Sequence, residues 1–280
     1  MTQIKLENVT LTFPTAAKAR RVGEAETANR ESRRVAGQID RDKRNRLSVS
    51  ALRSVSLELN DGDRFGIIGS NGSGKTTLLR VMGGIYTPQK GRVLTKGRIA
   101  TMFSMGIGMN AEATGLQNIY LSGLMAGANR RQIKQVVPEI IEFTELGDYV
   151  HLPIRTYSQG MAMRLKFACA TAFRPDIVLL DEWIGAGDED FQEKAQVRIN
   201  ELLEKAGIIV IASHNLQLIR SVATKVIWLE RGEVRMIGET QTVLDARAAE
   251  RKRLAEENDG DDYVEEPTLH NLTTVRSAAN

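Results

Sequence analysis

A glycine-rich stretch in the first third of the chain carries residue types that bind phosphate. It fits the pattern G-x-x-x-x-G-K-[ST] and consists of Gly69, Ser70, Asn71, Gly72, Ser73, Gly74, Lys75, Thr76 and Thr77. The apolar run Arg64–Ile68 before it predicts a buried strand, and Thr76–Met82 predicts a helix. In that order, backbone N–H groups and the positive end of the helix face an anion. Because Lys75 suits the β- and γ-phosphates and Thr76 suits Mg²⁺, the stretch predicts a nucleoside triphosphate site.

Two carboxylates follow a second apolar run. Ile177–Leu180 is the kind of continuous apolar strand that lies buried in a parallel sheet, and Asp181 and Glu182 come directly after it. Asp181 can hold Mg²⁺ at the sheet edge that carries Lys75. Glu182 can orient and polarise a water molecule for attack on the γ-phosphate.

Two further motifs are weaker when taken alone. His214 follows the apolar run Ile208–Ala212, and adjacent parallel strands bring their C-terminal ends to one crevice, where His214 would contact the γ-phosphate or the attacking water. Ser158, Gln159 and Gly160 open a helical pattern that Pro175 stops. The start of that helix is either an anion site or simply a helix cap formed by Ser158.

Composition excludes several classes of protein. The chain has 280 residues, of which 42% are hydrophobic and 26% charged, which is ordinary for a globular protein. A net charge of +3 is too small to predict nucleic-acid binding. A single cysteine, Cys169, cannot form an internal disulfide and is expected to be buried and inert. Without an 18-residue apolar run or a signal-peptide core, the chain is expected in the cytoplasm.

The remaining pattern predicts strands, helices and two charged segments. Strands are expected over 3–13 (ended by Pro14), from 49 to 59, around 92–94 and over 98–103, with a hairpin turning at 231–232. Helices are expected over 114–127, 129–143, 145–150 and 161–173. Residues 15–47 hold twice as many basic as acidic side chains and predict an exposed, partly helical or mobile insertion. It is either a solvated loop or a contact surface for a partner or anionic lipid.

Taken in order, the motifs resemble those of one protein family. The set GSNGSGKTT, TYSQGM, IVLLDE, GAGD and ASHN resembles the nucleotide-binding subunit of an ABC transporter, with YSQG where LSGG is usual. Four features resemble the subgroup that exports capsular polysaccharide, O-antigen or teichoic acid. They are the tyrosine and methionine of YSQGM, the basic insertion, the motif TGLQNIY, and LDEWIGAGD followed by FQ. The resemblance covers residues 3 to 240.

This resemblance implies an α/β fold. It consists of a P-loop NTPase (RecA-like) core with an antiparallel β edge subdomain and an inserted α-helical subdomain. The nucleotide-binding domain would span residues 1–244, with the basic insertion at 15–47 and the helical subdomain at about 105–157. Residues 245–280 are charged and predict a frayed helix and a disordered tail.

The resemblance also implies an ATP-hydrolysing homodimer. Two copies would face head to tail, with each ATP and Mg²⁺ between Lys75 of one copy and Ser158–Gly160 of the other. Phe13 would stack on adenine, or it is a core residue. A separate ABC-2-type permease would bind the helical subdomain, so that the chain reaches the cytoplasmic face of the inner membrane as a peripheral subunit that drives polysaccharide export.

One departure from the family and several rivals bear on this interpretation. Most ABC ATPases carry a glutamine where this chain has Ser104 and Met105, but the polysaccharide subgroup often lacks it too. The alternatives are the ATPase of another exporter or an importer, a soluble ABC ATPase of translation or DNA repair, and a non-catalytic regulatory cassette. Intact Lys75, Glu182 and His214 argue against the last.

Replacing Glu182 with glutamine tests its predicted role. The amide keeps the size of the side chain but polarises water poorly, so we expect Glu182→Gln to bind ATP and to lose turnover. Nucleotide binding and phosphate release measured on the same preparation check this. An undiminished ATPase rate would remove Glu182 from the mechanism.

Overall fold

The computed structural model describes residues 2–18, 38–41, 46–173, 175–181 and 189–259. The chain divides into two compact units, Met1–Val243 and Leu244–Asn280. The first unit contains both β-sheets and every helix that precedes α7 (Thr240–Asp259). Within the described residues, no helix is both long and apolar enough to cross a membrane.

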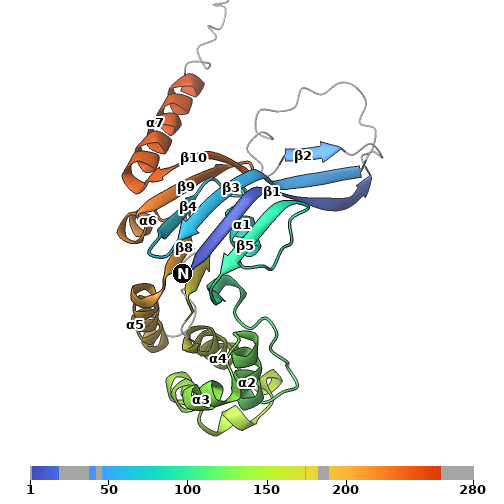
Figure 1. Ribbon diagram of the computed structural model, residues 1–280, viewed down its shortest axis with the longest axis vertical. Helices are drawn as coiled ribbons and strands as arrows, with labels where there is room; N and C mark the ends of the chain where they lie inside the picture. Colours follow the sequence, from blue (N-terminus) through green and yellow to red (C-terminus); the bar gives the residue numbers. More distant parts are fainter. Residues whose placement is uncertain (1, 19–37, 42–45, 174, 182–188, 260–280) are drawn as a thin grey trace, which may run out of the picture. The chain divides into compact units, whose positions relative to one another are not determined.

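Two sheets are present in the first unit (Figure 1). The first is antiparallel and has the order β2-β3-β1-β5; the second has the order β10-β9-β4-β8-β7-β6 and is parallel except for its β9–β10 hairpin. The strands are β1 Gln3–Lys18, β2 Gln38–Arg41, β3 Arg46–Asn60, β4 Arg64–Ile68, β5 Lys90–Lys96, β6 Ile99–Thr101, β7 Ile177–Asp181, β8 Ile208–Ala212, β9 Lys225–Glu230 and β10 Glu233–Glu239.

The described residues that precede α7 also form α-helices and short 3₁₀ turns. They are α1 Lys75–Met82, α2 Gly115–Met125, α3 Arg130–Thr144, α4 Gln159–Ala172, α5 Glu189–Lys205 and α6 Leu216–Val222, with 3₁₀ turns η2 Met102–Ser104, η3 Gly147–His151 and η4 Ile154–Thr156. The helices α2, α3 and α4 pack on one another around a hydrophobic cluster of their own. Thr114 and Asn129 start α2 and α3 as capping boxes, with Gln117 and Gln132 at the third helical position.

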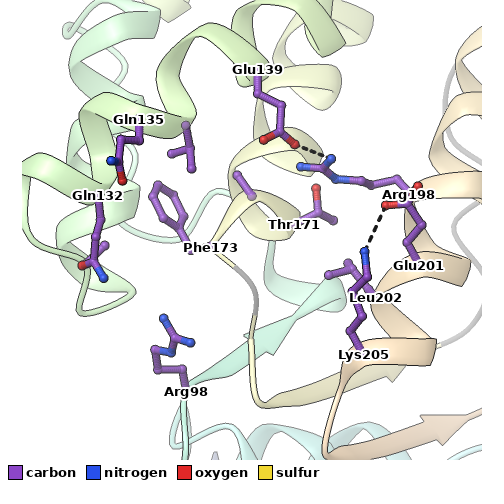
Figure 2. A pocket seen from close by; sticks show the side chains of 13 residues that line it. Arg98, Gln132, Gln135, Glu139, Thr171, Phe173, Arg198, Glu201, Leu202 and Lys205 are labelled. Atoms are coloured by element: carbon purple, nitrogen blue, oxygen red, sulfur yellow. Dashed lines mark ion pairs between the residues drawn. The ribbon is translucent and has the colours of Figure 1, made fainter.

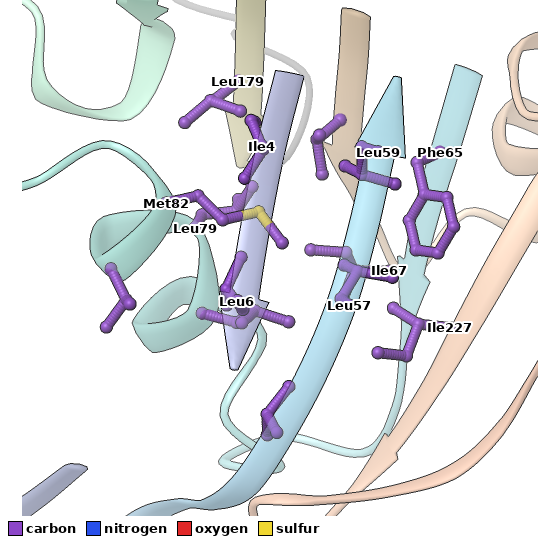
Figure 3. Close-up of a cluster of buried hydrophobic side chains, with 14 of the residues drawn as sticks. Ile4, Leu6, Leu57, Leu59, Phe65, Ile67, Leu79, Met82, Leu179 and Ile227 are labelled. Carbon is purple, nitrogen blue, oxygen red and sulfur yellow. The ribbon is translucent and has the colours of Figure 1, made fainter. Parts of the chain in front are cut away.

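The main core lies between the two sheets and α1 (Figure 3). Its members include Ile4, Leu6, Leu57, Leu59, Phe65, Ile67, Leu79, Met82, Leu179 and Ile227. The apolar runs predicted as buried parallel strands are β7 and β8, whose apolar residues are all buried. Burial on both faces explains why these strands show no alternation of polar and apolar residues.

The prediction that Pro14 ends the first strand is wrong, because β1 continues to Lys18 and pairs Pro14 with Ser48 of β3. The backbone N–H of Thr12 points away from β3, to the side chain of Gln89. Alternate residues of a strand direct their N–H groups to the same side, so the nitrogen of Pro14 also lies on the side away from β3. A proline is tolerated there because no ladder hydrogen bond is lost.

Three other predictions differ from the structure. Residues 15–47 were expected to form an exposed, partly helical or mobile insertion. Their described parts are strands, namely the end of β1, β2 and the start of β3, whereas residues 19–37 and 42–45 lie outside the described part. The strand expected over 98–103 is limited to β6, because the chain turns into η2 at Met102. The helix expected from about 245 begins earlier, at Thr240.

The main core predicts a stability contrast between two leucines. Leu179 of β7 is fully buried, whereas Leu94 of β5 is 52% exposed. We expect Leu179→Ala to lower the free energy of unfolding by about 2–5 kcal/mol through lost burial and a cavity. The matched change Leu94→Ala should cost about 0.5 kcal/mol or less. Urea unfolding followed by circular dichroism measures both, and equal losses would contradict this placement of the core.

Candidate functional site

The stretch predicted to bind phosphate, residues 69–77, connects β4 to α1 and includes the start of that helix, as expected. Gly74 caps α1 in the left-handed region, with φ +106°, and Lys75 is the first helical residue. Gly72, with φ +70°, also needs the freedom of glycine. These two positions let the backbone turn sharply just before α1.

Lys75 and Thr76 lie side by side at the start of α1. Lys75 is only 7% exposed, and its Nζ donates to the carbonyl oxygens of Gly69 (3.1 Å) and Ser70 (3.0 Å). The ammonium group is therefore held inside the loop by the loop's own backbone. Thr76 is half-buried and follows at the next position.

The loop is packed against two other backbones at a point that sequence reasoning missed. A Cβ on Gly74 or on Gly232 would each lie 2.7 Å from the carbonyl oxygen of Ala51. Gly232 also donates its N–H to the Ser73 carbonyl at 2.9 Å. The glycine of the β9–β10 turn was predicted only as a hairpin signal, but it also fixes the loop. The residues next to Gly74 and Gly232 in the sequence do not indicate that the two glycines both approach Ala51.

The loop has the features expected of a phosphate cradle. Within the described part of the chain, the buried Oγ of Ser73 has no hydrogen-bond partner. A Cβ on Gly69 would lie 2.3 Å from that Oγ and 2.3 Å from the Leu229 carbonyl oxygen. A buried unpaired hydroxyl beside an obligatory glycine fits a polyphosphate ligand, because such a hydroxyl costs free energy until it is paired.

The sheet register brings Asp181 and His214 to the same edge as the loop. Asp181 is the last residue of β7 and pairs with Ala212 of β8, which in turn pairs with Ile67 of β4. His214 lies two residues beyond Ala212 and is exposed. The three segments therefore leave the sheet at one level. Glu182 lies outside the described residues.

The Asn215 side chain fixes the chain just after His214. Its Oδ1 accepts from the backbone N–H groups of Gln217 (3.0 Å) and Leu218 (3.2 Å), which caps α6. Asn215 in turn donates its N–H to the Oγ of Ser213 at 3.1 Å. These bonds set the direction in which the chain leaves β8.

The predicted second anion motif is separate from the first. Ser158 caps α4 by accepting from the Met161 N–H at 3.2 Å, and Gln159 and Gly160 follow, all three exposed. This helix belongs to the α2–α4 cluster rather than to the main core. Tyr157 anchors the motif, since its Oη donates to the Tyr149 carbonyl at 2.7 Å. Burial raises the pKa of Tyr157.

Phe13, the predicted adenine residue, lies on β1 and is 36% exposed. It pairs with Val49 of β3 and makes an edge contact with the ring of Tyr86, 5.4 Å between centroids. It is therefore neither a buried core residue nor a fully solvated one.

Aromatic and ionic contacts join α4 to α5, together with the end of α3. Phe143, Phe167 and Phe191 form a cluster with centroid distances from 5.6 to 5.8 Å. Glu145 pairs with both Lys194 and Arg164, which lower the pKa of its carboxyl group. Next to these contacts lies a cavity of about 580 Å³ between α3 and α5 (Figure 2), crossed by the Arg198–Glu139 ion pair.

Comparisons with known proteins identify relatives of the chain. The sequence model of the family "ABC transporter" matches residues 52–185. The O-antigen export system ATP-binding protein RfbE of Yersinia enterocolitica is 42% identical over 83% of this chain and 96% of its own length. The teichoic acids export ATP-binding protein TagH of Bacillus anthracis is 40% identical over 70% of this chain, which spans only 35% of that relative.

Solved structures show the same fold at low sequence identity. The dimeric, post-hydrolysis structure of the ATP-binding cassette MJ0796 bound to ADP and Pi has a TM-score of 0.58 and 22% identity, and covers 85% of this chain and 98% of its own. A structure of the ATP binding subunit of an ABC transporter has a TM-score of 0.62 and 17% identity, over 88% of this chain and 93% of its own.

The thiol of Cys169 should be inert. It is 3% exposed on α4, and burial raises its pKa to about 12. The thiolate is the reactive form, so a raised pKa makes the thiol less reactive. We expect iodoacetamide to label the native chain slowly and the urea-unfolded chain rapidly, and Cys169→Ser to keep its ATPase rate. Rapid native labelling, or lost activity, would contradict this.

Proposed function

The chain belongs to the ABC transporter family, among its ATP-binding proteins, and we propose that it hydrolyses ATP to drive export of a polysaccharide across the cytoplasmic membrane. The ATPase part of the proposal rests on the register of the parallel sheet. That register brings Asp181, His214 and the phosphate loop (residues 69–77) to one edge of the sheet. The export part is supported by relatives whose names include O-antigen export and teichoic acids export. The polymer is then a capsular polysaccharide, an O-antigen or a similar glycan.

The residues of the loop would bind the polyphosphate. Lys75 and the backbone N–H groups would hold the β- and γ-phosphates, and the Ser73 hydroxyl would gain a partner. Thr76 and Asp181 would supply oxygen ligands of the kind that Mg²⁺ prefers, and the ion would offset charge on the phosphates. Glu182 would orient the attacking water, and His214 would contact the γ-phosphate or that water.

A second copy of the chain would complete each site. Ser158–Gly160 opens a helix of a different hydrophobic cluster, and these three residues are exposed. A helix N-terminus favours an anion, so the motif suits the phosphates held by another chain. We therefore propose a head-to-tail homodimer with ATP between Lys75 of one copy and Ser158–Gly160 of the other.

A membrane permease of the ABC-2 type is the proposed partner. Residues of about 105–157 expose large apolar side chains, with exposed fractions of 57% for Ile107, 52% for Leu124 and 61% for Met125. Ile107 and Met125 line the same pocket, and exposed apolar side chains that lie together mark contact surfaces. Binding there would hold the chain at the cytoplasmic face of the inner membrane. We propose that residues 1–244 form the nucleotide-binding domain, which includes the basic insertion at 15–47, and that residues 245–280 form the charged C-terminal tail.

Gly160 offers a test of the shared site. A Cβ at Gly160 would meet only the Ser158 Oγ, at 3.8 Å, so a larger side chain is tolerated within one chain. We expect Gly160→Leu to bind ATP with wild-type affinity but to lose about 10²-fold in ATPase rate, because the bulk separates the two copies. In vesicles that also hold the permease, glycan export should fall in parallel.

Lys75→Ala is the control, and it should weaken ATP binding itself. Wild-type ATPase activity in Gly160→Leu would contradict the shared site. ATP hydrolysis by wild-type chain without glycan movement in those vesicles would contradict export while leaving the ATPase proposal in place.

A further inference from the structure

The loop between α1 and β5, residues 83–89, holds the backbone of β1 next to Phe13. Beyond Thr10, β1 no longer pairs with β5. The Gln89 side chain takes over there: its Oε1 accepts from the Thr12 N–H at 2.7 Å, and its Nε2 donates to the Thr12 carbonyl at 2.7 Å. The Gln89 backbone N–H also donates to the Thr10 carbonyl at 3.1 Å. Gln89 thus replaces a missing strand neighbour at the residue before Phe13.

The same loop contacts the ring of Phe13. Tyr86 meets it with an interplanar angle of 72° and a centroid distance of 5.4 Å. In an edge-to-face pair, at least one face of each ring is not covered by the other. Because Phe13 remains 36% exposed, the contact with Tyr86 does not cover this residue completely.

Tyr86 is itself fixed to the helix that starts with Lys75. Arg80 of α1 donates from Nη1 to the Tyr86 Oη at 3.1 Å, and its guanidinium lies 5.7 Å from the ring centroid. The Tyr86 N–H donates to the Arg80 carbonyl at 3.2 Å. A continuous set of contacts therefore runs from α1 through Tyr86 to Phe13.

We infer that Tyr86 and Gln89 are positioning residues that hold Phe13 in place for the adenine base, at a fixed distance from the phosphate loop. This inference rests on the proposed function, because it needs ATP as the ligand. Both residues act through Phe13 and touch neither phosphate nor metal. Their removal should therefore affect base recognition and leave phosphate binding intact.

Calorimetric titration of the full chain with ADP and with tripolyphosphate, which has no base, separates these effects. We use Tyr86→Leu, since Tyr86 packs against the main core and leucine keeps apolar volume there. We expect Tyr86→Leu to raise the Kd for ADP about three- to tenfold, the size of an aromatic pair contact, and to leave tripolyphosphate binding within about twofold. Gln89→Ala should show the same pattern.

Matched variants define the mechanism. Tyr86→Phe keeps the ring and should retain most ADP affinity. Tyr149→Ala removes a tyrosine that is 52% exposed on η3, and it should leave the Kd for ADP unchanged. In steady-state assays, the KM for ATP should rise in Tyr86→Leu while kcat stays within about twofold. In the Phe13→Ala background, Tyr86→Leu should add no further loss of ADP affinity, because its effect passes through Phe13.

Three results would overturn the inference. The first is that Tyr86→Leu weakens the binding of ADP and of tripolyphosphate equally. The second is that Tyr86→Leu causes its full loss of ADP affinity again in the Phe13→Ala background. The third is that Phe13→Ala keeps wild-type ADP affinity. In each case ATP hydrolysis by the wild-type chain leaves the proposed function standing. Absence of ATP and ADP binding by the wild-type chain would instead overturn the proposed function and this inference together.

Discussion

The pairing of β8 with β4 on one side and β7 on the other is the constraint on which the site depends. Ala212 is in register with Ile67 and with Asp181, so the phosphate loop, the His214 segment and the Asp181 carboxylate all leave the sheet at one level. The continuous apolar sequences of β7 and β8 enforce this arrangement, because both faces of each strand are buried. A one-residue slip of β8 would turn its side chains to the opposite faces of the sheet. It would also displace Asp181 and His214 from the level of the loop.

A second constraint separates the two anion motifs. The loop is fixed to β3 and to the β9–β10 turn by close backbone approach at Gly74 and Gly232, within the main core. Ser158 opens a helix that packs in a different cluster and is joined to α5 by aromatic and ionic contacts. The two motifs therefore belong to separate hydrophobic clusters, which suits the proposed head-to-tail dimer.

Sequence patterns predicted the elements that carry local signals and failed where neighbours decide. The phosphate loop, β7, β8 and the capped α4 follow from residue types within a few positions, and the structure has them where they were expected. That β8 lies between β4 and β7 has no such signal. Pro14 was misjudged because the sequence does not show which edge of β1 is paired. The Gln89 contact with Thr12 joins residues 77 positions apart, and no motif announces it.

Disulfide cross-linking between two differently labelled chains tests the shared nucleotide site most directly. Cys169 is the one cysteine of the sequence, so Cys169→Ser leaves a cysteine-free background. One chain then carries Ser70→Cys in the phosphate loop and the other Gly160→Cys at the start of α4. The account predicts a cross-linked heterodimer when the two chains are mixed with ATP and mild oxidant, and little without ATP. If both variants bind ATP but form no cross-link in the mixture, the two motifs do not enclose one nucleotide and the account is contradicted.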